Sequence, residues 1–385
     1  MSAPADLREG RPAPDDKPPR ALGYVAAFDG VRGVAVQIVL LSHLNVILPI
    51  PRILVVPGAV VPLDMFFVLS GFLITALLLR EQLTSGRLDV LAFYQRRALR
   101  LFPALIAVVI AHAIYAWLAG LPRDLELTSL RSILFYFANW QMAFAPKDFL
   151  GGAVFAEGLQ HLWSLSVEEQ FYLVWPLVVL SFIGARRRFG SVAAGLLAII
   201  ALIGLYRALL FYNGDPWSAV LTRTDTRADA LLVGAFLAFV WTRRREPTQW
   251  LRPAAWGAVA ILLPCLAFAT VNSSFLFYGG LSLIDWSCGM ILLAVLDARW
   301  AGTRLFRFSP FVRIGKVSYG LYLWHLPIYF MIRRYGTRDL WGALLALALT
   351  AACALVSWFL LEKPALRWKR QARPVVAVAQ PADVP

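Results

Sequence analysis

Long apolar stretches separated by short basic or polar connections cover most of this 385-residue chain. The stretches are about 17–25 residues long, which is the length that a helix needs to cross roughly 30 Å of hydrocarbon. The pattern predicts an all-α integral membrane protein, a bundle of about ten transmembrane helices with no soluble domain. The spans are expected near residues 31–48, 61–79, 101–121, 165–184, 191–212, 228–242, 253–271, 281–297, 315–332 and 340–361.

The segments outside these spans differ in character. Residues 1–20 and 371–385 lack an apolar face and contain several prolines, so we expect two disordered cytoplasmic tails around one transmembrane domain, residues 21–370. The long connection 122–164 is aromatic, which fits an interfacial or re-entrant segment on the outer face better than a flexible loop. The short sixth span, 228–242, is expected to begin earlier or to have a non-helical first turn.

Composition agrees with the membrane class. Hydrophobic residues make up 59% of the chain and charged residues only 16%, whereas a soluble domain of this length needs far more polar residues on its surface. The three cysteines, Cys265, Cys288 and Cys353, all fall in apolar stretches. They are predicted to be packing residues, because neither a disulfide framework nor a zinc site has this pattern.

The formal net charge of +14 reflects topology more than nucleic-acid binding. Basic residues occur in short clusters between apolar stretches, with no single basic face. If the N-terminus is cytoplasmic, 26 of the 37 Lys and Arg residues fall in inside segments and 9 in outside segments. The positive-inside rule then predicts that both termini are cytoplasmic. Arginine greatly outnumbers lysine and alanine is abundant, as in GC-rich bacteria, so we expect a multi-pass protein of a bacterial inner membrane.

Ionisable residues inside spans are costly and are therefore candidates for function. Arg32 and His43 lie eleven residues apart in the first span. At about 100° and 1.5 Å per residue, they share a helix face and are separated by roughly 16 Å along the axis. Arg32 is expected near the cytoplasmic entrance and His43 beyond mid-membrane. The alternatives are a snorkelling arginine and a histidine that bonds a neighbouring helix.

Further ionisable residues are expected at the depth of His43. The second span opens with Asp64, the fourth contains the adjacent Glu168 and Glu169, and two more histidines are His161 and His325. Two adjacent carboxylates in an apolar span are hard to explain as packing, so at least one should face a polar interior. The remaining histidine, His112, has no polar neighbours in its span and is assigned to packing.

These residues predict a polar chamber reached from the cytoplasm. Its imidazoles are candidate general bases, because their pKa is close to neutral pH. A nearby carboxylate would fix the tautomer and stabilise the imidazolium. The chain has no Gly-x-Ser-x-Gly elbow, P-loop or His-Glu-x-x-His zinc motif, and we expect no metal.

A dense basic group precedes the third span. Arg96, Arg97 and Arg100 lie at helical spacing next to Pro103. One interpretation is a topology signal that follows the positive-inside rule. The other is a clamp in which guanidinium groups form bidentate bonds to the phosphates of an anionic cosubstrate.

The order of these motifs resembles the acyltransferase 3 family of membrane-bound O-acyltransferases. The resemblance extends over about residues 24–365 and rests on FDGVRGVAVQIVLLSH, VPLDMFFVLSGFLIT, YQRRALRLFP, HLWSLSVEEQFYLVWP, DTRADALLVG, GKVSYGLYLWHLP and LEKP. It implies an acyl-CoA donor on the cytoplasmic side whose thioester reaches toward His43, with Arg32 at the entrance. Glu168 matches the family's glutamate, and His161 and His325 match its other polar positions.

The residues and the resemblance together predict an acyl-CoA-dependent O-acyltransferase. Acetyl-CoA is the favoured donor, and the acceptor is expected to be a sugar hydroxyl on a glycan or a glycosylated small molecule. In this hypothesis His43 removes the acceptor's proton or relays the acyl group, while Glu168 or Asp64 supports its charge. Arginines position the CoA phosphates, namely Arg32, Arg96, Arg97 and Arg100.

Three alternatives stay open at this point. Some relatives carry a fused extracytoplasmic esterase-like domain that does not follow the last span here, so we expect either direct acylation of the acceptor or a separate extracytoplasmic transferase. The second functional class is a transporter that exports a sugar or lipid-linked intermediate, although no inverted repeat is visible. A sensor or scaffold without catalysis leaves Glu168 and Glu169 unexplained.

Overall fold

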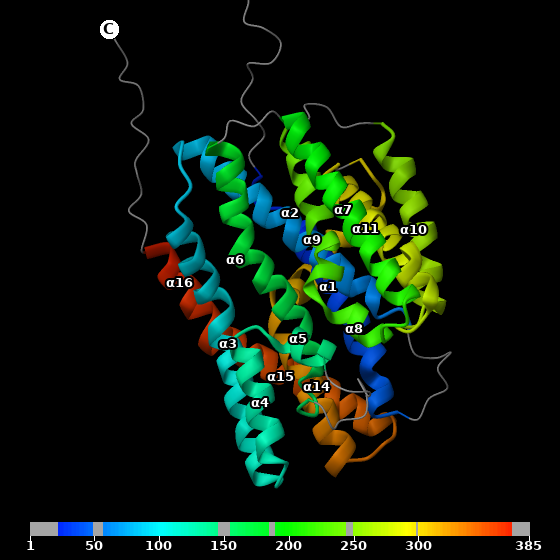
Figure 1. The fold of residues 1–385 in the computed structure, drawn as a ribbon. Coiled ribbons are helices and arrows are strands. Elements are labelled where there is room, and N and C mark those ends of the chain that lie inside the picture. The colour runs from blue at the N-terminus through cyan, green and yellow to red at the C-terminus, as the bar shows by residue number, and fades with distance from the viewer. Residues whose placement is uncertain are drawn as a thin grey trace, which may run out of the picture.

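The computed structural model describes residues 22–48, 57–144, 155–184, 189–243, 249–297 and 299–371, and all secondary structure in these ranges is helical. The long helices form a single bundle (Figure 1). They are α1 (Ala26–Ser42), α2 (Val60–Ser85), α3 (Val90–Leu118), α6 (Trp163–Gly184), α7 (Phe189–Tyr212), α9 (Thr224–Arg243), α10 (Leu251–Phe268), α11 (Leu281–Val295), α14 (Ser318–Tyr335) and α15 (Leu340–Ser357). The predicted tails lie outside the described residues, apart from Gln371.

Shorter helices connect or extend the long ones. In the described ranges six of them are α-helical: α4 (Arg123–Leu134), α5 (Ala138–Phe144), α8 (Trp217–Thr222), α12 (Gly302–Phe306), α13 (Ser309–Lys316) and α16 (Lys363–Gln371). The 3-10 turn η1 (His43–Val46) extends α1, and the 3-10 turn η3 (Gln160–Leu162) precedes α6. The π-helical turn η4 (Leu276–Gly280) precedes α11, and the π-helical turn η5 (Trp358–Glu362) joins α15 to α16 (Lys363–Gln371).

Eight helical segments in the described ranges are long and apolar enough to cross a membrane, which makes the chain a multi-pass membrane protein. These eight segments coincide with eight of the ten predicted spans and are Ala26–Val46, Val60–Ser85, Val90–Leu118, Gln160–Ile183, Phe189–Tyr212, Leu251–Phe268, Leu276–Val295 and Leu340–Arg367. The other two predicted spans, 228–242 and 315–332, coincide with α9 and α14, which are helical but more polar. The total of ten spans therefore stays a prediction.

Helix α9 begins at Thr224, four residues before its predicted start. Its first turns carry Arg227 and Asp229, whose side chains are fully buried. Arg227 forms an ion pair with Asp64 of α2, and Asp229 accepts a hydrogen bond of 2.7 Å from Arg207 of α7. The expectation that this span begins earlier is met, and Asp64 of α2 provides the partner with which the charge of Arg227 lies inside the bundle.

Backbone contact between α2 and α9 holds these charges together. A Cβ atom at Gly71 of α2 would lie 1.9 Å from the carbonyl oxygen of Leu231, and one at Gly234 of α9 would lie 2.0 Å from that of Val68. Small residues permit such close helix packing in membranes. Any larger side chain at Gly71 or Gly234 would push the two helices apart and separate Asp64 from Arg227.

The connection 122–164 is mostly helical where the structure describes it. Helix α4 begins directly after α3, and its Glu126 meets His112 of α3, with 2.9 Å between the carboxylate and Nε2. The assignment of His112 to packing without polar company was wrong, since both side chains are buried and form an ion pair. Sequence periodicity within the third span did not reveal this partner because it belongs to the following segment.

Candidate active site

A cavity of about 670 Å³ lies between α1, α2, α3, α6, α13, α14 and the C-terminal η5 and α16. This volume is in the range of small-molecule and cofactor sites. Apolar residues cover much of its wall, and its polar lining residues come from six helices and the turn η5. These polar residues are Asp29, Arg32, Ser70, Arg97, Arg100, Ser164, Glu168, Tyr172, Lys316, Ser318, Tyr319, Tyr322 and Glu362.

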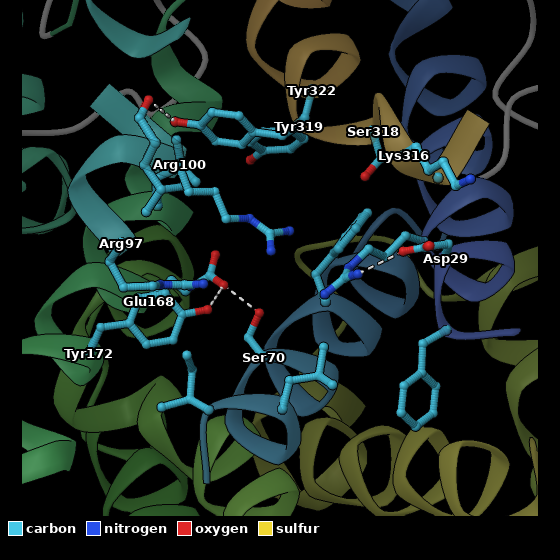
Figure 2. Close-up of a pocket in the computed structure, with 18 of the residues that line it drawn as sticks. Asp29, Ser70, Arg97, Arg100, Glu168, Tyr172, Lys316, Ser318, Tyr319 and Tyr322 are labelled. Carbon is cyan, nitrogen blue, oxygen red and sulfur yellow. Dashed lines mark hydrogen bonds and ion pairs between the residues drawn. The ribbon is translucent and has the colours of Figure 1, made fainter. Parts of the chain in front are cut away.

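One part of the cavity is strongly basic. Arg100 extends from α3 toward its middle, and Arg97 lies on the same helix one turn earlier (Figure 2). Lys316, at the end of α13, lies on another side of the cavity. Arg32 of α1 also lines it and bonds Asp29 at 3.1 Å. Four cations around one cavity are suited to an anionic ligand with several phosphate oxygens.

Helix α3 is longer at its N-terminal end than the predicted span, so it includes the arginines. The helix begins at Val90 and not near residue 101, because the basic segment is itself helical. At 1.5 Å per residue, Arg97 and Arg100 lie roughly 10 and 15 Å from the start of the helix. The cavity can therefore reach Glu168 of α6, which Figure 2 shows beside Arg97.

Glu168 is fixed by two hydroxyl groups. Ser70 of α2 and Tyr172 of α6 both donate hydrogen bonds to one of its carboxylate oxygens (Figure 2). The guanidinium of Arg97 lies 3.8 Å above the ring of Tyr172. The expectation that one of the two adjacent glutamates faces a polar interior is met by Glu168. Its bonds place it with the arginines, however, and not with the imidazoles.

The side chain of Arg96 lies outside the cavity lining, unlike those of Arg97 and Arg100. Its guanidinium bonds Glu81 of α2 at 2.8 Å, and Arg96 does not contribute to the lining of the described cavity. Of the three arginines in this segment, the structure brings Arg97 and Arg100 to the cavity with Arg32.

Three histidines from distant segments meet next to the cavity, behind its lining residue Tyr322, and none of the three is itself a lining residue. His43 begins η1, His161 lies in η3 and His325 in α14. The ring centroids of His161 and His325 are 4.7 Å apart, and those of His43 and His325 are 5.2 Å apart. His161 and His325 are buried and His43 is half-buried. We call these three residues the imidazole cluster.

Hydrogen bonds to carbonyl groups fix the tautomers of two of these rings. Nδ1 of His43 lies 2.9 Å from the carbonyl oxygen of Val39, and Nδ1 of His325 lies 2.6 Å from that of Tyr322. A carbonyl oxygen can only accept, so Nδ1 carries the proton in both neutral rings and Nε2 keeps its lone pair. Within the described residues, Nε2 of His325 has no hydrogen-bond partner. The cluster therefore presents two basic nitrogens.

Asp64 belongs to a separate buried group. It pairs with Arg227, and Asp229, Arg207 and Asp285 lie within electrostatic range. Among the described residues Asp64 forms no hydrogen bond or ion pair with the imidazole cluster, so the geometry offers His43 no support from Asp64. Asp64 and Arg227 instead hold α2 and α9 together.

The sequence interpretation missed several polar residues of the cavity. The missed Ser164 and Tyr172 lie four residues before and after the predicted Glu168 along α6, and the missed Tyr322 precedes His325 by three residues in α14. Side chains three or four residues apart share one face of a helix. This spacing was the available signal, but only ionisable residues were considered as candidates.

Comparisons with known proteins identify the family of the chain. A family model described as an acyltransferase domain matches residues 25–362. The chain belongs to the acyltransferase 3 family. It is 32% identical over 363 residues to YrhL of Bacillus subtilis (strain 168), covering 89% of this chain and 55% of that protein. No solved structure matches the chain.

Two further relatives of this chain have names that describe a reaction. The peptidoglycan O-acetyltransferase OatA of Listeria monocytogenes is 32% identical over 355 residues, covering 89% of this chain and 56% of OatA. The O-acetyltransferase OatA of Staphylococcus aureus (strain NCTC 8325 / PS 47) is 30% identical over 354 residues, covering 89% and 57%. The chain thus spans a little over half the length of these relatives. Membership of an acyltransferase family favours an enzyme over the transporter alternative.

Proposed function

We propose that the chain transfers an acetyl group from cytoplasmic acetyl-CoA to a hydroxyl group of a glycan, with peptidoglycan as the acceptor class that the relatives' names favour. The observation that carries this proposal is a cavity with four cationic side chains whose lining residue Tyr322 contacts two of three clustered imidazoles. Arg32, Arg97, Arg100 and Lys316 would hold the phosphates of the donor. The acyl thioester would then lie toward the imidazole cluster.

In the proposed reaction the acceptor oxygen attacks the carbonyl carbon of the thioester and the carbon–sulfur bond breaks. Nε2 of His43 takes the hydroxyl proton and passes it to the departing thiolate, so the products are an acetyl ester and CoA with a free thiol. His43 is assigned this step because it is half-buried, whereas His161 and His325 are buried. Its Nδ1 bond to Val39 holds the ring in the tautomer that a general base needs.

The function is tested with purified full-length protein, acetyl-CoA and soluble peptidoglycan fragments. We expect release of CoA thiol that depends on the fragment, together with a fragment whose mass increases by one acetyl group. A folded protein that releases no thiol and leaves the fragment unmodified contradicts the proposal.

The donor site gives a sharper prediction. Arg97→Gln and Arg100→Gln should each raise the KM for acetyl-CoA by about 10–100-fold, because a hydrogen bond to a charged group contributes about 1.5–3 kcal/mol. Arg96→Gln is the matched control on the same helix. It removes a bond to Glu81 outside the cavity lining and should leave the KM within about twofold. An unchanged KM in both Arg97→Gln and Arg100→Gln would show that these arginines serve topology alone.

We also propose that residues 21–370 form one domain of ten spans in a bacterial inner membrane, with α9 and α14 as the two polar spans and both termini cytoplasmic. The excess of Lys and Arg in the expected inside segments supports this orientation. Reporter fusions after residues 145 and 385 should give periplasmic and cytoplasmic signals respectively. Equal signals at the two sites would overturn the span count or the orientation.

A further inference from the structure

Only one layer of side chains separates the cavity from the buried imidazoles. Tyr322 of α14 and Ser164 of α6 both line the cavity. The ring centroid of Tyr322 is 5.0 Å from that of His161 and 5.6 Å from that of His325. These distances are in the range of rings in direct contact. Tyr322 therefore touches the cavity on one side and two members of the imidazole cluster on the other.

Hydrogen bonds hold this layer in place. The phenol oxygen of Tyr322 lies 2.6 Å from Oγ of Ser164 and donates to the carbonyl oxygen of His161 at 2.7 Å. The backbone carbonyl of Tyr322 accepts the bond from Nδ1 of His325. The hydroxyl and the backbone carbonyl of Tyr322 therefore both bond histidines of the cluster. These bonds restrict the ring of Tyr322 to one rotamer.

The surface next to Tyr322 is apolar. Phe66 of α2 also lines the cavity, and it packs against the same small hydrophobic group as Tyr322, formed by Val36, Leu40, Leu321 and Ala354. The cavity therefore changes from cationic, at Arg97 and Arg100, to aromatic beside Tyr322. An acyl chain that follows the phosphates of a bound donor would end against these two rings.

We propose that Tyr322, held by Ser164, limits the donor to short acyl chains by closing the end of the cavity beside the imidazole cluster. This inference rests on the proposed function. Close-packed interiors accept extra methylene groups only at a cost of about 1–3 kcal/mol, and a hydrophobic pocket discriminates about 10–200-fold for each methylene. An acetyl group fits in front of the ring, whereas a butyryl group displaces it.

The test is the ratio of kcat/KM for butyryl-CoA to that for acetyl-CoA, measured on full-length protein with the same acceptor. Tyr322→Ala should raise this ratio at least tenfold relative to the wild type, because the space of the ring becomes available to the chain. Tyr322→Phe keeps the ring and should leave the ratio within about threefold while kcat falls. Since both donors are measured on one preparation, the ratio does not depend on the folded fraction.

Tyr319→Ala is the matched control. Tyr319 lines the same cavity on the same helix, but its hydroxyl donates to the carbonyl oxygen of Leu101 on α3 at 3.0 Å (Figure 2). Its removal enlarges the cavity away from the imidazole cluster, so the ratio should change by less than about threefold. An equal increase in Tyr319→Ala and Tyr322→Ala would mean that cavity volume alone sets the preference, and it would overturn the assignment to Tyr322.

The possible failures are distinguishable. A wild-type protein that transfers neither group contradicts the proposed function. A wild-type protein that transfers acetyl, together with a Tyr322→Ala protein of unchanged ratio, contradicts only the inference. Should Tyr322→Ala not fold, Tyr322→Leu has a smaller side chain that stays apolar, and an unchanged ratio in that variant overturns the inference equally.

Discussion

Replacement of His43 by alanine is expected to lower the turnover number by about 10²–10⁴, the usual contribution of a positioned acid–base group. His43 is the half-buried member of the imidazole cluster, and its Nδ1 bond to Val39 leaves Nε2 basic. The protein should still insert and bind acetyl-CoA, because the arginines of the cavity are unchanged. Turnover per folded molecule and the KM for acetyl-CoA are the quantities to measure, on the same preparations.

His112→Ala is the matched control for this experiment. His112 is also buried in a span, but its partner is Glu126 of α4. Its loss should lower thermal stability and leave the activity of each folded molecule nearly unchanged. If His43→Ala behaved in the same way, the catalytic base would have to be His325 or His161.

Replacement of Arg227 by alanine is expected to destabilise the bundle by about 3–5 kcal/mol, the cost of leaving a buried charge unpaired. The buried group contains Asp64, Asp229 and Asp285 but only two guanidiniums, those of Arg227 and Arg207. Without Arg227, three carboxyl groups face one cation. Unfolding in detergent, followed by heat or by denaturant, measures the loss.

The charges of this buried group also predict which substitutions near Arg227 have a small effect on stability. Neither carboxyl oxygen of Asp285 has a hydrogen-bond partner within the described residues, so Asp285→Asn keeps the shape of the side chain, breaks no hydrogen bond there, and should cost less than about 1 kcal/mol. The double variant Arg227→Ala, Asp64→Ala should be more stable than Arg227→Ala alone. If Asp64→Ala changed the stability by the same amount with and without Arg227, the pair would not be coupled.

The sequence predicted the class of fold because hydrophobic length is a property of each segment alone. Eight predicted spans coincide with apolar helices for this reason. The limits of α3 and α9 were less accurate, since both helices begin with charged residues that resemble a connection. Arg97 and Arg227 lie inside the bundle only because Tyr172 and Asp64 contact them from other helices. Such partners are set by packing and cannot be found from the period of one helix.

The candidate site was predicted to a similar extent. The histidines could be singled out as costly polar groups, and the structure brings His43, His161 and His325 together. The sequence did not indicate which carboxylate accompanies them. Glu168 and Asp64 were both placed near the histidines by their expected depth in the membrane alone. In the structure Glu168 bonds Ser70 and Tyr172 beside Arg97, whereas Asp64 pairs with Arg227. The sequence predicts how deep a residue lies along its own span, but contact between two residues also requires that their helices are neighbours.

The pairing of α9 with earlier helices has a consequence for the synthesis of the protein. Arg and Asp residues each cost up to about 2.5–3.5 kcal/mol in an inserting helix, the value at its centre, and α9 carries Arg227 and Asp229 in its first turns. Their partners, Asp64 and Arg207, lie on α2 and α7 and are translated earlier. Translation proceeds at about 5–20 residues per second, so α9 is synthesised roughly 8–35 s after Asp64. During that interval the nascent N-terminal half holds an unpaired carboxyl group in or beside the bilayer, so stable assembly of this half has to follow the arrival of α9.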